Sequence, residues 1–194
     1  MEKLTRSDLY SLEQYAVARP EFRAQVIAHK KTRRVPLGDI AAQYFEDRLT
    51  MHYQIQEMLR VERIFEAEGI QEELDAYNPL IPDGSNLKAT FMIEVPDEEK
   101  RREVLAQLKG IENEVWIRVD GFDPVFAVAD EDLERENEEK TSSVHFMRFE
   151  FTPDMIAAAK AGAALGIGIS HSEYTQQLEP LPAGIRASLV QDFA

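Results

Sequence analysis

A run of turn residues divides the chain into two parts with different hydrophobic patterns. Before residue 71, apolar side chains recur at the spacing of a helix, and after residue 86 several short segments alternate as strands do. The residues between them are rich in breakers, which favour turns over regular structure. The breakers are Asn78-Pro79, Ile81-Pro82 and Asp83-Gly84. This change of pattern predicts an α+β fold.

The two parts are expected to share one domain. A chain of 194 residues usually makes one domain or two small ones. With 44% hydrophobic and 30% charged residues, the composition is that of an ordinary globular protein. We therefore expect a single domain over residues 1–194, with a helical subregion over residues 1–76 and a sheet-plus-helices subregion over residues 86–194.

One long helix is predicted to organise the helical subregion. Residues 43–70 place apolar side chains such as Tyr44, Ile55 and Leu59 along one broad side when positions are set 100° apart. The same side carries four ionisable residues, and burying a charge is costly unless it is paired. They are Arg48, His52, Glu62 and Glu66.

These four ionisable residues have two interpretations. In a buried polar site, desolvation and nearby charges would shift their pKa values toward acid–base work or metal binding. Alternatively, they would form internal salt bridges with each other or with neighbouring elements. His52 and Glu62 lie about 15 Å apart along a helix, so they could not share one ion. Glu62 and Glu66, four residues apart, could.

The second part of the chain predicts an antiparallel sheet with helices on one face. Strands are expected over residues 90–95, 115–119, 125–128, 144–151 and 165–170. Asp97 and Thr152 are expected to cap two intervening helices. This order is close to a split βαβ sheet of ferredoxin-like type, against which the helical first third and its long central helix would pack.

The strand over residues 144–151 has two distinct faces. Successive side chains of a strand point to opposite sides, so its alternation separates an apolar set from a mixed one. The expected core face consists of His145, Met147, Phe149 and Phe151. The opposite face consists of Val144, Phe146, Arg148 and Glu150.

The absence of cysteine restricts any metal chemistry. It excludes disulfides, thiolate nucleophiles and iron–sulfur clusters held by cysteine. A metal site would use histidine and carboxylate, with iron or manganese as candidate ions. The candidate ligands are Glu62, Glu66, His145 and His171. The alternative is that both histidines are structural or lie at the surface.

The charge of the chain is uneven. A net charge of −14 argues against nucleic acid as a main partner, because nucleic-acid binding depends on neutralising phosphates with Lys and Arg. One basic cluster could hold an anion such as a nucleotide phosphate. It could instead neutralise the acidic remainder, within the chain or at the interface of a homo-oligomer. The cluster contains His29, Lys30, Arg33 and Arg34, together with Lys31.

Several longer segments, taken together, resemble a known bacterial family. They are Arg19–Arg23, His29–Arg34, Phe45-Glu46 followed by Gln54–Arg60, Tyr77–Asn86 and Glu139–Phe146. In this order and over essentially the whole chain, they are similar to the family catalogued as domain of unknown function 3501. The resemblance carries no established activity. It implies a role near peroxide or iron metabolism, since members are often encoded beside rubrerythrin-like and iron–sulfur oxidoreductase proteins.

These observations favour an accessory or binding protein over an enzyme. The expected partner is a rubrerythrin-like or iron–sulfur redox protein, as the resemblance implies. A metal-dependent enzyme with a His/Glu site is the alternative, and anion or nucleotide binding at the basic cluster is a weaker one. No apolar run reaches the 18 or so residues that would span a bilayer, and the N-terminus lacks a signal-peptide pattern. We expect a cytoplasmic protein with no membrane partner.

Overall fold

Two antiparallel sheets form the body of the protein. The computed structural model describes residues 2–131, 135 and 139–194. One sheet has the strand order β1-β2-β3-β7-β6 and the other the order β5-β4-β8-β9. The first contains β1 (Arg34–Leu37), β2 (Ala41–Glu46), β3 (Asn86–Ile93), β7 (Val144–Glu150) and β6 (Val128–Ala129). The second contains β5 (Val125–Phe126), β4 (Val115–Val119), β8 (Leu165–His171) and β9 (Tyr174–Leu178).

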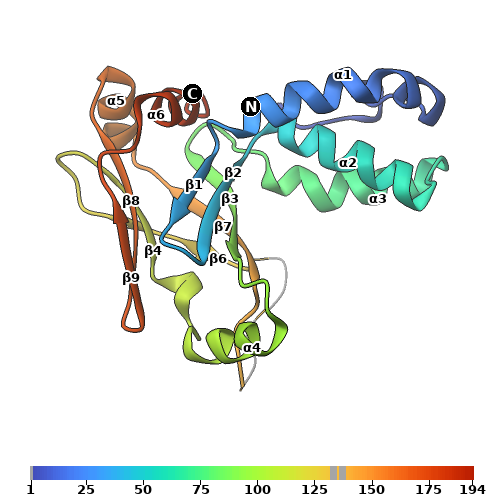
Figure 1. Ribbon diagram of the computed structural model, residues 1–194. Helices are drawn as coiled ribbons and strands as arrows, with labels where there is room; N and C mark the ends of the chain where they lie inside the picture. Colours follow the sequence, from blue (N-terminus) through green and yellow to red (C-terminus); the bar gives the residue numbers. More distant parts are fainter. Residues whose placement is uncertain (1, 132–134, 136–138) are drawn as a thin grey trace.

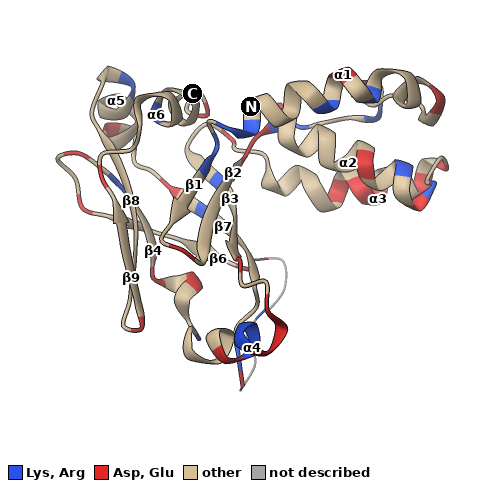
Figure 2. Cartoon of the chain, viewed as in Figure 1, with Lys and Arg blue, Asp and Glu red and all other residues tan. Residues whose placement is uncertain are grey.

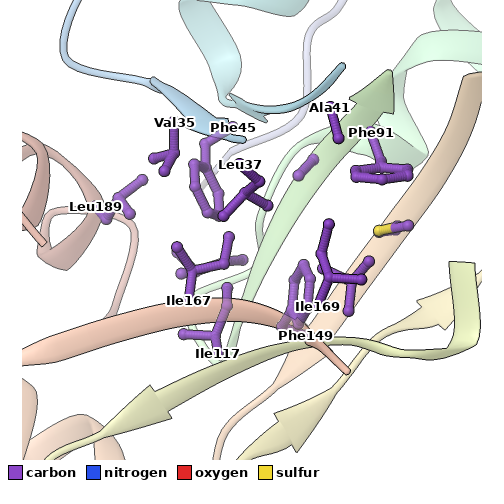
Figure 3. Packing of buried hydrophobic residues seen from close by; sticks show 14 of the residues in the cluster. Val35, Leu37, Ala41, Phe45, Phe91, Ile117, Phe149, Ile167, Ile169 and Leu189 are labelled. Atoms are coloured by element: carbon purple, nitrogen blue, oxygen red, sulfur yellow. The ribbon is translucent and has the colours of Figure 1, made fainter. Parts of the chain in front are cut away.

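The main core lies between these two sheets. The inner face of the five-stranded sheet contributes Leu37, Phe45 and Phe149, all of them buried. Ile117 and Ile167, paired across β4 and β8, face them from the four-stranded sheet, as Figure 3 shows. This apolar contact is the largest hydrophobic cluster among the described residues.

Three helices form an arm that projects from one end of the five-stranded sheet, on the side away from the four-stranded sheet (Figure 1). They are α1 (Leu12–Lys30), α2 (Arg48–Glu62) and α3 (Ala67–Tyr77). The arm has small cores of its own, one of them around Met51, Ile55 and Leu59. Glu57 on α2 links α1 to α2, since it accepts hydrogen bonds from Tyr15 and Arg19 of α1.

The remaining helices cover the ends of the sheets. They are α4 (Glu98–Gln107), α5 (Pro153–Ala161) and α6 (Ala183–Val190), with short 3-10 turns η1 (Arg6–Asp8), η2 (Asn78–Leu80) and η3 (Ile111–Asn113). Asp97 and Thr152 accept backbone hydrogen bonds at the starts of α4 and α5, which confirms both predicted caps. No helix in the described part of the chain has the length and apolar character needed to cross a bilayer.

The prediction of one helix over residues 43–70 is wrong. The segment begins inside β2, continues as α2 and turns into α3. Asp47 caps α2 through the backbone N–H of Thr50, and α2 ends at Arg63, whose left-handed backbone (φ 56°) stops the helix. The expected helical subregion over residues 1–76 therefore also contains two strands of the sheet.

The prediction of a single split βαβ sheet is also not met. After β3, the chain passes through α4 and enters β4, which pairs with β5 and β8 and not with the first sheet. The strands thus separate into two packed layers. The expected hairpin between residues 115–119 and 125–128 is present as β4 and β5, and the expected core face of β7 is buried.

Gly168 offers a test of the packing within the four-stranded sheet. A Cβ at this position would lie 2.6 Å from Cε2 of Trp116 and 2.8 Å from the carbonyl oxygen of Gln176. We expect Gly168→Ala to lower the free energy of unfolding by about 1–3 kcal/mol, because the Trp116 ring or the backbone of β9 would have to shift. Urea unfolding measures the change. Gly184→Ala is the control, since nothing lies within 4 Å of its Cβ, and equal losses in both variants would contradict the packing.

Candidate functional site

The outer face of the five-stranded sheet carries the candidate site. Residues paired across antiparallel strands point to the same side. One row on this face is Tyr44, Thr90 and Phe146, and the next is Glu46, Lys88 and Arg148. The four-stranded sheet covers the opposite face, while the arm lies over one end of this one (Figure 1).

The first of two adjoining pockets on this face, the Lys88 pocket, lies between the sheet and the end of α3. Its volume is about 500 Å³, within the range typical of small-molecule sites. Its apolar walls come from the outer face of β7 and from the turn after α3. It is lined by Asp75, Ala76, Tyr77, Pro79, Leu80, Lys88, Glu131, Phe146, Met147 and Arg148.

The second pocket, the Tyr44 pocket, continues the same groove under α2. It measures about 390 Å³ and shares Tyr77, Leu80 and Phe146 with the Lys88 pocket. Its other apolar contacts include Met51 and Met92. Together the two pockets form one groove, with an aromatic and aliphatic surface at the place where they meet.

Lys88 is the unusual residue of this groove. It lies in the middle of β3, which is paired on both sides, and its side chain is half-buried. Among the described residues, its amine makes no hydrogen bond or ion pair. Burial, and then the positive charge of Arg148, lower the pKa of Lys88 from its usual range.

The charges around Lys88 already have partners. Arg148 pairs with Glu131 and Glu150 at 2.9 and 2.7 Å. Glu46 accepts a hydrogen bond from the Thr90 hydroxyl at 2.8 Å. Lys3, whose pKa burial also lowers, donates to the carbonyl oxygens of Asn78 and Ile81. Within the described part of the chain, Lys88 thus remains the cation of this pocket whose charge no neighbour balances by contact.

Arg33, predicted as an anion-binding residue, is part of the structure's interior. Its side chain is 2% exposed and forms a forked ion pair with Asp192 near the C-terminus. It also donates to the carbonyl oxygens of Phe45 and Glu46. Burial raises the pKa of Asp192 to about 6, against the opposing effect of Arg33. The guanidinium of Arg33 is therefore bound within the protein and does not face an external anion.

His29, Arg34 and Lys30 of the predicted basic cluster point to different places. His29 contacts Asp47 at 2.5 Å. Arg34 donates to the hydroxyl of Tyr44 and pairs with Glu94 at 3.0 Å. Lys30 lines the Tyr44 pocket, with its amine 5.9 Å from the ring centre of Tyr53. The cluster does not converge on one anion site, but Lys30 reaches the groove.

The four ionisable residues predicted on one helix face are also dispersed. Arg48 pairs with Asp8 at 2.6 Å. His52 stacks on Tyr10 and lies tilted against Phe22, its Nε2 has no hydrogen-bond partner among the described residues, and burial lowers its pKa. Glu62 ends α2 and Glu66 precedes α3, and both are exposed. Because the chain turns between these two glutamates, their predicted helical spacing does not exist.

The two histidines proposed as metal ligands have protein partners. His171 contacts the carbonyl oxygen of Lys109 at 2.9 Å. His145 is fully buried, with Nδ1 2.6 Å from Asp130 and Nε2 3.0 Å from the hydroxyl of Thr141. In the described ranges, no group of three or more His, Asp or Glu residues could hold a metal ion. Nothing here brings Glu62, Glu66 and the histidines together.

Asp130, His145 and Thr141 have the order of an acid, base and hydroxyl nucleophile. Such a triad needs its hydroxyl exposed to substrate. Thr141 is 1% exposed, and its hydroxyl donates to the carboxylate of Glu112 at 3.1 Å. The arrangement therefore serves as a satisfied polar network in the interior.

Lys88 was not among the site residues predicted from the sequence, although two other residues of its pocket were predicted to share one face of a strand. The alternation of residues 144–151 already placed Phe146 and Arg148 together on the face away from the core. Lys88 is a lone lysine in an apolar segment that precedes the predicted strand over residues 90–95. Such a lysine within a strand paired on both sides marks a charge whose amine must find a polar environment.

Comparison with known proteins gives a family and a fold. Residues 3–193 match the family model described as "Protein of unknown function (DUF3501)". A crystal structure of a "novel protein of unknown function" from Burkholderia pseudomallei K96243 is 53% identical in sequence, covers 100% of both chains and superposes with a TM-score of 0.94. None of the curated proteins matches the chain.

Adjacent arginines provide a matched test of the buried ion pair. We expect Arg33→Ala to reduce the free energy of unfolding by about 3–5 kcal/mol, because it leaves Asp192 buried without its counter-ion. Arg34→Ala, whose ion pair lies at the surface, should cost about 1 kcal/mol or less. Urea unfolding compares them. If Arg33→Ala does not fold, Arg33→Lys should still be less stable than Arg34→Lys, and equal stabilities would contradict the assignment.

Proposed function

Since the chain belongs to the family described as protein of unknown function DUF3501, we propose its function from the groove: it is a binding protein for a small organic monocarboxylate. The observation that supports this most directly is the half-buried Lys88 amine, which has no hydrogen bond or ion pair among the described residues. A charge in a partly desolvated pocket interacts more strongly with an opposite charge than it would in water. A carboxylate would supply the counter-ion that Lys88 lacks.

The lining of the Lys88 pocket defines the rest of the ligand. Tyr77, Leu80 and Phe146 offer a surface suited to an aromatic or branched apolar group. Asp75 and Glu131 line the same pocket and would repel a multiply charged group. The site therefore favours one negative charge on an apolar body. A nucleotide polyphosphate, the weaker hypothesis from the basic cluster, fits this distribution of charges less well.

Binding of phenylacetate tests the proposal. We expect this anion to raise the melting temperature of the protein and to bind measurably in calorimetry, whereas the neutral phenylacetamide should bind more weakly. Lys88→Met should weaken phenylacetate binding about ten- to a hundredfold, because a charge-assisted hydrogen bond is lost.

The control for this experiment is Lys100→Met, which removes an exposed lysine of α4. This variant should bind phenylacetate as the unmodified protein does. Equal affinity in the Lys88→Met and Lys100→Met variants, or equal binding of the acid and the amide, would contradict the proposal.

A role beside a redox partner stays a separate prediction. It rests on the family resemblance, which implies a rubrerythrin-like or iron–sulfur partner, and the groove neither requires nor opposes it. We expect the purified protein to retain a rubrerythrin-like protein in a pull-down. Absence of a complex under both reducing and oxidising conditions would count against the partnership and would leave the carboxylate proposal unaffected.

A further inference from the structure

We propose that Lys88 forms a reversible imine with a 2-oxo acid bound in the Lys88 pocket. This inference rests on the proposed carboxylate binding and specifies its chemistry. A 2-oxo acid carries a carbonyl carbon directly beside its carboxylate. An amine that attracts the carboxylate is therefore already next to an electrophile.

The surroundings of Lys88 are those of a nucleophilic lysine. An amine becomes reactive when burial and a neighbouring cation favour its neutral form. Lys88 has both, because it is half-buried and because Arg148 lies opposite it on the neighbouring strand. The lowered pKa of Lys88 agrees with this arrangement. Glu131 and Glu150 hold Arg148 in place, and the charge of Glu131 opposes the effect of Arg148 without outweighing the burial of Lys88.

Lys3 shows why burial alone does not identify a nucleophile. Burial lowers the pKa of Lys3 as it does that of Lys88. The amine of Lys3, however, donates to two backbone carbonyl oxygens, at 2.7 and 2.8 Å, and these bonds stabilise its charged form. Lys88 has no such acceptor among the described residues. Lys3 is therefore an internal comparison for labelling.

The backbone at Lys88 is rigid. The residue is paired with Glu46 on β2 and with Arg148 on β7, in the centre of the five-stranded sheet. A site on a central strand holds its reactive group more precisely than a site on a loop. The aromatic wall of Phe146, beside Arg148 on β7, lies where the side chain of the oxo acid would pack.

The proposed step is balanced in atoms and charge. The nitrogen lone pair of neutral Lys88 forms an N–C bond to the carbonyl carbon as the C=O π electrons move to the oxygen. Transfer of a proton from nitrogen to this oxygen gives a carbinolamine. Proton transfer through solvent, to which the groove is open, converts the hydroxyl into water, which leaves as the C=N bond forms. Overall, one lysine ammonium and one carbonyl give one protonated imine and one water. The positive charge remains beside the carboxylate.

Reductive trapping tests this inference. The full chain is incubated with phenylpyruvate and sodium cyanoborohydride, whose hydride reduces the imine to a stable secondary amine. We expect the intact mass to increase by one adduct, and peptide mapping to find several-fold more adduct on Lys88 than on Lys3 or Lys100. Lys88→Arg keeps a positive charge but should lose the adduct, whereas Lys100→Arg should retain it.

Phenyllactate separates this inference from the proposed function, because it has the same body and carboxylate but no carbonyl. We expect it to raise the melting temperature in a Lys88-dependent manner without changing the mass. If phenylpyruvate and phenyllactate both bind and no adduct forms, the imine is refuted and carboxylate binding stands. If neither binds, both proposals fail. An adduct spread evenly over the lysines would also refute the imine.

Discussion

The apolar contact between the two sheets determines which face of the five-stranded sheet can carry a functional site. It occupies one face of each strand in the five-stranded sheet, with side chains such as Phe45 and Phe149. Because side chains alternate along a strand, Lys88 of β3 and Arg148 of β7 then occupy the opposite face. The arm partly covers that face, so Lys88 is half-buried in a groove. The position of the charge thus follows from the position of the core.

The sequence predicted local structure where a single cause dominates. Asp97 and Thr152 cap helices through contacts within one turn, and the alternation of β7 reports burial on one face only. β2 was mistaken for helix for the opposite reason. Most residues of Ala41–Glu46 are buried whichever face they occupy. The segment therefore lacks the alternation of apolar and polar residues that marks a half-buried strand.

The candidate site was harder to predict because its residues are defined by distant partners. Arg33 looked available for an anion, but Asp192 neutralises it from the far end of the chain. Arg48 looked buried beside His52, but Asp8 holds it near the surface. The converse holds for Lys88, whose significance comes from the lack of a hydrogen bond or ion pair to any described residue. Residue type and spacing in the sequence do not indicate whether a charged side chain has an ion-pair partner in a distant segment.

The buried ion pair at the base of the arm also orders events during synthesis. Arg33 and Asp192 are separated by 159 positions, so the guanidinium is synthesised well before this counter-ion. Until Asp192 is synthesised, Arg33 can pair with Asp47, 3.4 Å away, but its charge lacks the forked partner that the folded interior provides. The arm can fold on its own small cores beforehand, but its junction with the sheet is completed only when the segment around Asp192 is present. The ion pair thus makes a late segment of the sequence a condition for closing an early one.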